Sequence, residues 1–360
     1  MHTNRGWWIP AEDGGPEREY VWPYINREIG LRLYYGGSQH KIQTKRISEC
    51  GTALIFIDSS VKDFQFLKKF PKKSVDVFLV SDETYSFIST ARLLLLNSTR
   101  SIYRDYPVHS FVNFVHWPIT TLRLAFKSVQ NDLGIILYLK ALLAGLVLAG
   151  KQFLISLTKS ITGKHLGHLP LGYTGGFENL FVKSNHLNDK ESLIKYALAN
   201  QEKIRREKKL QVFFTGQIGK FDRQLMLAEA LKVNLNLGPI HESFGGPKEQ
   251  LAKQYAIRNY FEGLKESYFS FCPPGNYSPE TFRYIESLLL FSFPLQPKRV
   301  ISNPLYSSPN GNTWQEFCRA TVKGSLDSFY DSQKILGALE CTLSNIRKVS
   351  IEVGIIEENS

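Results

Sequence analysis

Four short apolar runs, each followed by polar residues or by a loop with glycine or proline, constrain the fold of this chain most strongly. ALIFID and VDVFLV occupy 53–58 and 75–80, and QVFF and YFSFC occupy 211–214 and 268–272. Short apolar runs that end in polar residues, with helical patterns between them, are typical of central strands in a parallel sheet. The sequence therefore predicts an α/β fold, in which ligands bind at the carboxyl ends of the strands.

The length and composition predict a globular protein of about two domains. The chain has 360 residues, of which 43% are hydrophobic and 21% are charged, and a domain holds roughly 150 residues. This balance excludes a disordered chain, a collagen, a coiled coil and a disulfide-framed mini-protein. The four cysteines, Cys50, Cys272, Cys318 and Cys341, form no CxxC pair, so we expect free thiols and neither a zinc knuckle nor a redox motif.

The net charge of +11 predicts an anionic partner. A basic protein attracts nucleic acid, anionic lipid or phosphorylated small molecules. The basic residues are dispersed and no helix-turn-helix signature is present, which argues against nucleic acid. The densest basic run, KIRREKK at 203–209, is interpreted as a solvated helix end. The first residues lack the apolar region of a signal peptide, so we expect a cytoplasmic protein.

An unusually apolar stretch covers 108–158. Its centre, LGIILYLKALLAGLVLAG at 133–150, carries one charged residue, Lys140, and lysines flank the stretch at 127, 151 and 159. Three readings stay open: a buried pair of core helices, a membrane-spanning helix, and a helix that lies in the membrane surface with basic flanks. The charge inside the run weakens the spanning reading.

The segment 267–295 carries the sharpest chemistry. It reads as a strand, a Pro/Gly loop, a helix and a second strand. Ser278 followed by Pro279 predicts the N-cap and first position of that helix. Gly275 would allow the backbone to approach a ligand closely. The free N–H groups of such a helix start can hold phosphate oxygens, so we expect a phosphate site in this loop.

Arg283 and Glu286 follow on the same helix, three residues apart, and therefore share one face. The planar guanidinium of Arg283 matches phosphate, and the Glu286 carboxylate would accept hydrogen bonds from ribose hydroxyls. The pair thus predicts a nucleoside-diphosphate site. The alternative is a capped helix with an Arg–Glu pair on its surface.

A second strand, glycine loop and helix start lie at 212–223, VFFTGQIGKFDR. Gly216 stands in the loop, and Arg223 stands at the start of the helix. Two such loops that face one cleft would hold a diphosphate from both sides. Alone, Gly216 also fits an ordinary turn.

These motifs, in this order, resemble the exostosin-type glycosyltransferase family. The matching motifs are YRDYP at 103–107, PLGY at 170–173, VFFTGQ with Arg223, the segment SYFSFCPPG with Arg283 and Glu286, and FPL at 293–295. The resemblance covers mainly 205–330. It implies a two-lobed GT-B fold that binds a nucleotide sugar between its lobes without a metal or other cofactor.

The resemblance also implies a residue set and a domain plan. Arg223 and Arg283 would neutralise the diphosphate, Glu286 would hold the ribose, and Gly275, Ser278 and Gly216 would contact the donor. The expected architecture is two Rossmann-like lobes with an apolar helical insertion in the N-terminal lobe. The expected boundaries are an acceptor-side lobe at 1–175 with its insertion at about 108–160, a nucleotide-sugar lobe at 176–330, and a C-terminal helix at 331–360.

The expected reaction is an inverting, metal-independent transfer of a hexose or pentose from a UDP-sugar to a glycan or glycolipid acceptor. Asp82 and Glu83 are the first candidates for the base, followed by Asp58 and His168, because they follow expected strands of the N-terminal lobe. Each of these acids also fits a turn or N-cap position. The family's Gly-Cys pair before the last strand is replaced by other residues here, which leaves the sugar open. A non-catalytic binding or scaffold subunit on a membrane surface is the alternative.

Overall fold

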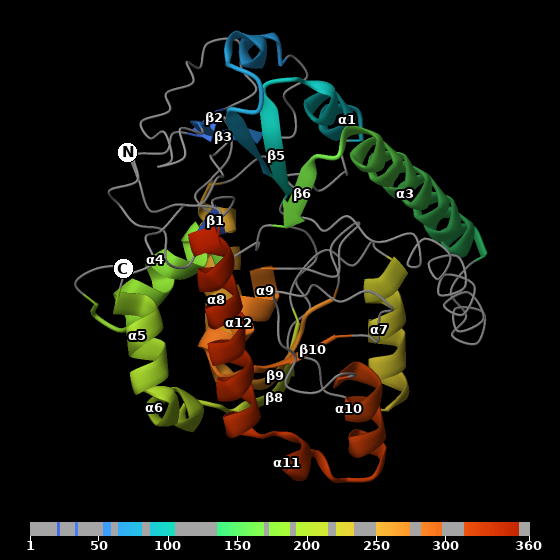
Figure 1. Cartoon of the computed structure of the whole chain (residues 1–360). Coiled ribbons are helices and arrows are strands. Elements are labelled where there is room, and N and C mark those ends of the chain that lie inside the picture. Colours follow the sequence, from blue (N-terminus) through green and yellow to red (C-terminus); the bar gives the residue numbers. More distant parts are fainter. Residues whose placement is uncertain are drawn as a thin grey trace.

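The computed structural model describes residues 20–21, 33–34, 53–58, 64–80, 87–104, 135–168, 173–187, 192–214, 221–233, 250–273, 282–296 and 313–352. In these ranges the chain forms two parallel sheets with helices packed around them (Figure 1). This confirms the predicted mixed α/β fold with parallel sheets. The two sheets come from separate halves of the sequence.

The first half of the chain forms a five-stranded sheet in which every neighbouring pair is parallel. Each strand lies next to the strand that precedes it in the sequence, and helical crossovers connect several of them. The strands, in spatial order, are β2 (Leu33–Tyr34), β3 (Ala53–Asp58), β4 (Val75–Val80), β5 (Thr99–Arg104) and β6 (His165–His168), with η2 (Gln65–Lys69), α1 (Phe87–Leu95) and α3 (Ile135–Thr162) between them.

The two faces of this sheet bury different side chains because side chains alternate along each strand. Val77 and Ile102 point into an aliphatic cluster with Leu94 of α1 and Ile155 of α3. Phe78 on β4 stacks against Tyr103 on β5 on the opposite face, with ring centroids 5.1 Å apart. Both rings belong to the larger core cluster of the second half of the chain.

The second half of the chain forms a three-stranded parallel sheet of order β10-β9-β8. Its core is strongly aromatic, and Phe269 of β9 contacts Phe293 and Phe317. The elements are β8 (Leu210–Phe213), α7 (Phe221–Lys232), α8 (Gln250–Glu266), β9 (Ser267–Phe271), α9 (Phe282–Leu289) and β10 (Phe293–Leu295).

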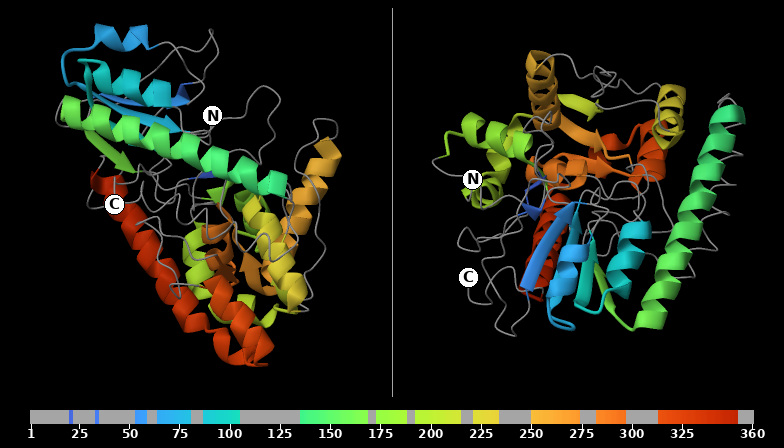
Figure 2. Two further views of the ribbon diagram at one scale, coloured as in Figure 1. Left: turned by 90° about the vertical axis from the view of Figure 1, so that its right-hand side faces the viewer. Right: turned by 90° about the horizontal axis from the view of Figure 1, so that it is seen from above.

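Further helices surround this sheet, and the last of them links the two halves. Figure 2 shows α12 running from the part around the three-stranded sheet to the five-stranded sheet. Its last residue, Glu352, is near enough to contribute to the raised pKa of Tyr103, after burial and Asp76. These helices are α4 (Gly175–Ser184), α5 (Ser192–Ala199), α6 (Gln201–Arg206), α10 (Thr313–Val322), α11 (Leu326–Phe329) and α12 (Ser332–Glu352). In addition, β1 (Tyr20–Val21) and β7 (Tyr173–Thr174) form a small antiparallel sheet.

The region predicted as an apolar insertion contains one long helix, α3 (Ile135–Thr162), in its described part. It is not a buried pair over this range, because several of its large apolar side chains are exposed. In the part of the chain that the structure describes, no helix has both the length and the apolar character needed to cross a membrane.

Candidate functional site

Helix α9 is enclosed by the protein although it carries charged residues. Every residue from 283 to 290 is buried. β10 runs parallel to β9 and begins soon after α9 ends, so α9 runs back along the sheet and its first turn lies toward the carboxyl ends of the strands. In open α/β sheets this edge is where ligands bind.

Arg283 and Glu286 are both buried, and Glu286 is fully enclosed. Their burial contradicts the alternative of an Arg–Glu pair on the surface. Arginine and glutamate are rarely buried unless other groups hold them. Helix α8 supplies such a group, Tyr260: its hydroxyl donates to Oε2 of Glu286 at 2.5 Å, and the guanidinium carbon of Arg283 lies 5.9 Å from the centre of its ring.

Burial, reinforced by the charge of Glu286, keeps the Tyr260 hydroxyl protonated. Burial raises the pKa of this phenol well above its ordinary value, the negative charge of Glu286 raises it further, and Arg283 opposes the shift. A protonated phenol is a hydrogen-bond donor. Tyr260 therefore fixes the orientation of the Glu286 carboxylate, and its ring offers a face to the Arg283 guanidinium.

A chain of small polar side chains lies beside this group. Ser270 donates to the Ser287 hydroxyl at 2.7 Å, and Ser287 donates to the backbone carbonyl of Arg283 at 2.6 Å. The sulfur of Cys272 lies 3.5 Å from the Ser287 hydroxyl. Burial raises the pKa of the Cys272 thiol to about 11, so at neutral pH this cysteine is a thiol and not a nucleophile.

The position of α8 depends on a close contact with β8. At Gly263, one turn after Tyr260, an added Cβ would lie 2.1 Å from the ring of Phe213. A larger residue there would push α8 away from the sheet. The glycine therefore helps to hold Tyr260 over α9.

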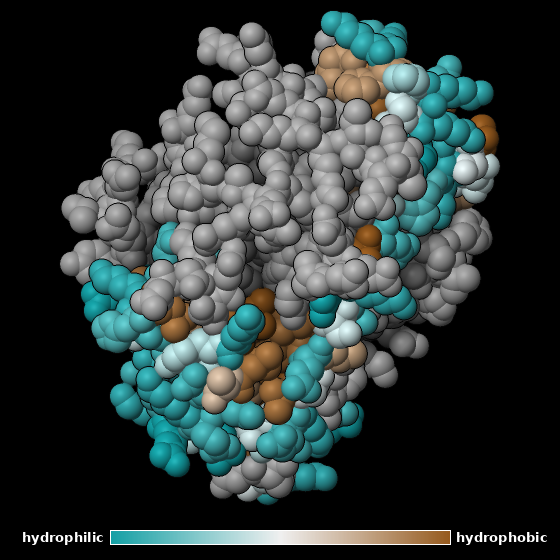
Figure 3. Space-filling model, turned by 60° about the vertical axis from the view of Figure 1, so that its left-hand side comes forward, coloured by the Kyte–Doolittle hydropathy of each residue, from teal (hydrophilic) through white to brown (hydrophobic). Residues whose placement is uncertain are grey.

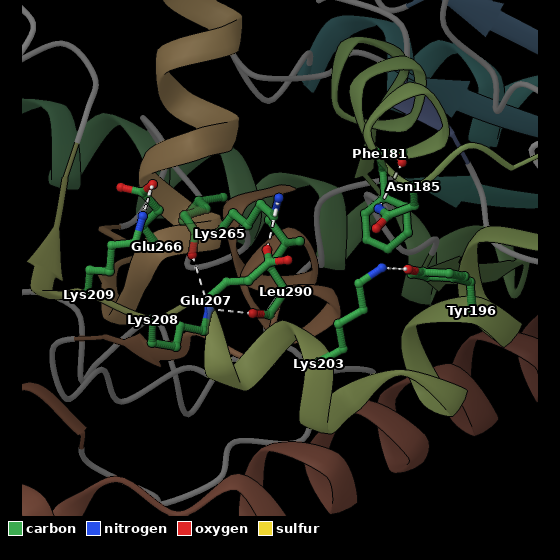
Figure 4. A network of polar contacts seen from close by, with 11 residues as sticks. Phe181, Asn185, Tyr196, Lys203, Glu207, Lys208, Lys209, Lys265, Glu266 and Leu290 are labelled. Atoms are coloured by element: carbon green, nitrogen blue, oxygen red, sulfur yellow. Dashed lines mark hydrogen bonds and ion pairs between the residues drawn. The ribbon is translucent and has the colours of Figure 1, made fainter.

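Lys208 binds the carboxyl-terminal ends of α8 and α9. Its Nζ donates to the carbonyl of Leu290 at 2.5 Å and to that of Leu264 at 3.3 Å, and Figure 4 shows the side chain pointing at the last turn of α9. Burial lowers the pKa of this lysine well below 10.5. The run 203–209 was predicted to be a solvated helix end. Lys203 and Lys209 are exposed as predicted, but Lys208 is buried.

The structure places the remaining predicted residues as follows. Arg223 is nearly fully buried in the first turn of α7, on a different helix from Arg283 and Glu286. Of the donor-binding predictions, Gly216, Gly275 and Ser278 lie outside the described residues, as do the base candidates Asp82 and Glu83.

Three further residues lie at the carboxyl edge of the five-stranded sheet. Arg104 ends β5 and is fully buried, and it pairs in register with His168, which ends β6 and is half-buried. Asp58 ends β3, and its side chain lies outside the described residues. This edge therefore carries His168, a predicted alternative base, beside an arginine from the YRDYP motif.

Sequence reasoning missed Tyr260 and Lys208. Tyr260 lies 26 residues before Glu286, and no local pattern links the two. Lys208 stands inside a basic run that resembles an exposed surface. The one available signal is Gly263, because a glycine inside a helical pattern often marks a close packing contact.

Neither a metal site nor a comparison with known proteins identifies the function of the chain. Within the described ranges, no group of three or more His, Cys, Asp or Glu side chains is placed to hold a metal ion. No protein-family model matches the chain. No curated protein matches it either.

Proposed function

We propose that the chain is an inverting, metal-independent glycosyltransferase that uses a nucleotide-diphosphate sugar, as its resemblance to the exostosin-type family implies. The observation that carries the proposal is the buried group of Arg283, Tyr260 and Glu286 on α8 and α9. A fixed cation and a fixed carboxylate near the carboxyl edge of a parallel sheet are the groups that recognise a diphosphate and a ribose.

In this proposal each charged residue has one task. Arg283, with Arg223, stabilises the negative charge that develops on the leaving nucleoside diphosphate. Glu286, oriented by the Tyr260 hydroxyl, accepts hydrogen bonds from the ribose hydroxyls. Gly216, Gly275 and Ser278 contact the phosphates.

The reaction joins an acceptor oxygen to the anomeric carbon. The acceptor hydroxyl attacks that carbon from the side opposite the leaving group, the bond from the carbon to the diphosphate oxygen breaks, and the hydroxyl proton moves to a base. Asp82 and Glu83 remain the first candidates for this base, followed by Asp58 and His168. We propose a UDP-sugar as donor, a glycan or glycolipid as acceptor, and a cytoplasmic location on a membrane surface.

The first experiment is a thermal-shift panel of nucleoside diphosphates and nucleotide sugars, with and without EDTA. A ligand that binds only the folded protein raises its melting temperature. We expect a shift with one nucleoside diphosphate, unchanged by EDTA, and loss of that shift in Arg283→Ala. Arg258→Ala, which removes an exposed arginine from α8, is the matched control and retains the shift.

Glu286→Gln covers the case in which Arg283→Ala does not fold, because the amide oxygen still accepts from Tyr260. Its expected result is a weaker shift at an unchanged melting temperature of the free protein. No shift with any nucleotide, or equal shifts in wild type and both variants, would overturn the proposed site. Nucleotide binding without sugar transfer or donor hydrolysis would instead favour the non-catalytic scaffold.

A further inference from the structure

Helix α3 presents a row of large apolar side chains to solvent. Their spacing by three, four and seven residues places them on one side of the helix, and over 22 residues the row is about 33 Å long. The left view of Figure 2 shows α3 along the outside of the molecule. This row, here called the α3 stripe, consists of Leu139, Leu143, Leu146, Val147, Phe153, Leu154, Leu157 and Ile161, which are all at least 40% exposed.

The α3 stripe is separate from the face of α3 that packs on the protein. Ile155 and Gln152 are buried on the other side of the helix, and Ile155 belongs to the aliphatic cluster with Leu94 of α1. The helix therefore has one apolar face that stabilises the fold and a second that does not. Single exposed apolar residues are common on proteins, but a continuous row is typical of an interaction surface.

A cluster of lysines lies at one end of the α3 stripe. Lys73 lies two residues before β4, and Lys164 lies directly before β6. The Lys164 amine donates to the backbone carbonyl of Leu96. The pKa of Lys164 is lowered mainly by burial and further by the positive charge of Lys73, which shows that the two lysines are close. This basic cluster, at the amino-terminal edge of the five-stranded sheet, consists of Lys72 and Lys73 before β4 and Lys164 before β6.

The described segments that carry the stripe and the basic cluster hold almost no acidic residues. Across the described ranges 64–80, 87–104 and 135–168, the one acidic residue is Asp76, which is buried and ion-paired with Arg100. The described segments that carry the stripe and the cluster are therefore basic and apolar. Figure 3 shows a face on which the described residues are mainly hydrophilic, with brown residues near its centre and a few more toward its edges.

We propose that α3 lies in the plane of an anionic lipid bilayer, with the α3 stripe in the boundary between headgroups and acyl chains and the basic cluster on the lipid phosphates. An in-plane helix uses these two features together. Because the Ile155 face holds α3 on the protein, only the stripe side is available to lipid. A second copy of the chain would also cover the stripe, but it carries the same net charge of +11, which opposes association of two basic surfaces.

The lysine that borders the stripe fits this orientation. Lys151 is half-buried and lies next to the stripe on the helix surface. A lysine at such a border places its carbon chain along the apolar surface and its amine at the headgroups. This inference deepens the proposed location at a membrane, and it stands even if nucleotide binding fails, because it uses none of the residues of the α9 site.

The test is flotation of the full chain with vesicles of phosphatidylcholine alone and with vesicles that contain one part in three of phosphatidylserine. We expect binding to the anionic vesicles only, and weaker binding at high salt. Leu143→Glu is expected to weaken the affinity at least about tenfold. Val322→Glu, at an equally exposed apolar position on α10, is the control and leaves the affinity unchanged.

A second variant tests the charge. Lys72→Glu with Lys73→Glu, two exposed lysines, is expected to weaken vesicle binding at least about 25-fold, since each lysine near an anionic surface contributes about fivefold. Lys323→Glu with Lys334→Glu changes exposed lysines in the turn after α10 and on α12 and is expected to have no effect. If Leu143→Glu misfolds, as judged by circular dichroism, Leu143→Ser takes its place.

Three outcomes would overturn the inference. The first is no binding to either kind of vesicle. The second is equal binding to both, or equal binding of all variants. The third is a wild-type dimer in solution that Leu143→Glu converts to a monomer, with no vesicle binding, which would assign the stripe to a second copy of the chain.

Discussion

The two sheet regions of this protein depart from the usual distribution of residues in opposite directions. Around the three-stranded sheet, charged side chains such as Arg283, Glu286 and Lys208 are enclosed within an aromatic core. Around the five-stranded sheet, large apolar side chains of α3 are exposed instead. Enclosed charge and exposed apolar surface are the two informative exceptions to ordinary burial, and each marks a different kind of binding.

The difference also predicts how each region responds to substitution. In the three-stranded region a polar group has fixed protein partners, so its removal leaves those partners buried without a hydrogen bond, at a cost of about 1 to 3 kcal/mol for each group. On the α3 stripe an apolar side chain contacts mainly water, so its removal changes stability little. The following predictions sharpen this comparison, from the largest effect to the smallest.

Lys208→Met is expected to lower the free energy of unfolding by about 3 kcal/mol, because it leaves the carbonyls of Leu264 and Leu290 without their donor. Lys209→Met is the control, since this neighbouring lysine is exposed and its amine lies 3.3 Å from Glu266; a change within about 0.5 kcal/mol is expected. Urea denaturation measures both. Equal effects in the two variants would show that the Lys208 contacts do not stabilise the fold.

Tyr260→Phe is expected to lower the free energy of unfolding by about 2 kcal/mol, because Glu286 loses its buried donor. The same variant should weaken nucleoside-diphosphate binding in the thermal-shift assay, since the carboxylate is no longer oriented. Tyr268→Phe is the matched control: this partly exposed ring lies edge-on to Tyr330. A change in Tyr268→Phe as large as that in Tyr260→Phe would contradict the assigned role.

The pH dependence of stability offers a third test of the enclosed charge. The pKa of Lys208 is lower in the folded protein than the ordinary 10.5, so between pH 8 and pH 10 the unfolded chain binds more protons at this residue. Stability attributable to Lys208 therefore rises with pH in this window, by up to about 1.4 kcal/mol per pH unit. The measurement is the difference between wild type and Lys208→Met in urea at several pH values, and a flat difference would contradict the shift.

Leu143→Ser is expected to change the free energy of unfolding by less than about 0.5 kcal/mol, because this side chain is 64% exposed. Leu94→Ala, in the aliphatic cluster that α3 covers, is expected to lower it by about 3 kcal/mol. Chemical denaturation of both variants separates the two sides of α3. A loss for Leu143→Ser as large as that for Leu94→Ala would mean that the stripe belongs to the core.

Local patterns were enough to predict several elements. The expected strands at 53–58, 75–80 and 293–295 have the bounds observed for β3, β4 and β10, because short apolar runs with clear ends have few alternatives. The common face of Arg283 and Glu286 follows from helical spacing in the same way. In contrast, α4 begins with two glycines, Gly175 and Gly176, although glycine is a weak helix former.

Burial and long-range partners could not be predicted. Tyr260 and Glu286 meet only because α8 packs beside α9, and Lys208 is enclosed only because the chain turns into β8 directly after it. For α3 the sequence left three readings open, since its apolar residues occupy much of the helix. The structure separates an inward side with Ile155 from an outward side with Leu143.

The fully buried Cys272 is a natural probe for opening of the α9 region, because the rate at which its thiol is modified can be measured without introducing a label. Its sulfur is enclosed and its pKa is about 11, whereas Cys341 on α12 is exposed. A thiol reagent followed by peptide mass spectrometry should modify Cys341 within seconds and Cys272 only when the segment around α9 opens. The modification rate of this one peptide therefore reports how often the enclosed charges meet water, and a nucleotide bound beside them should slow it.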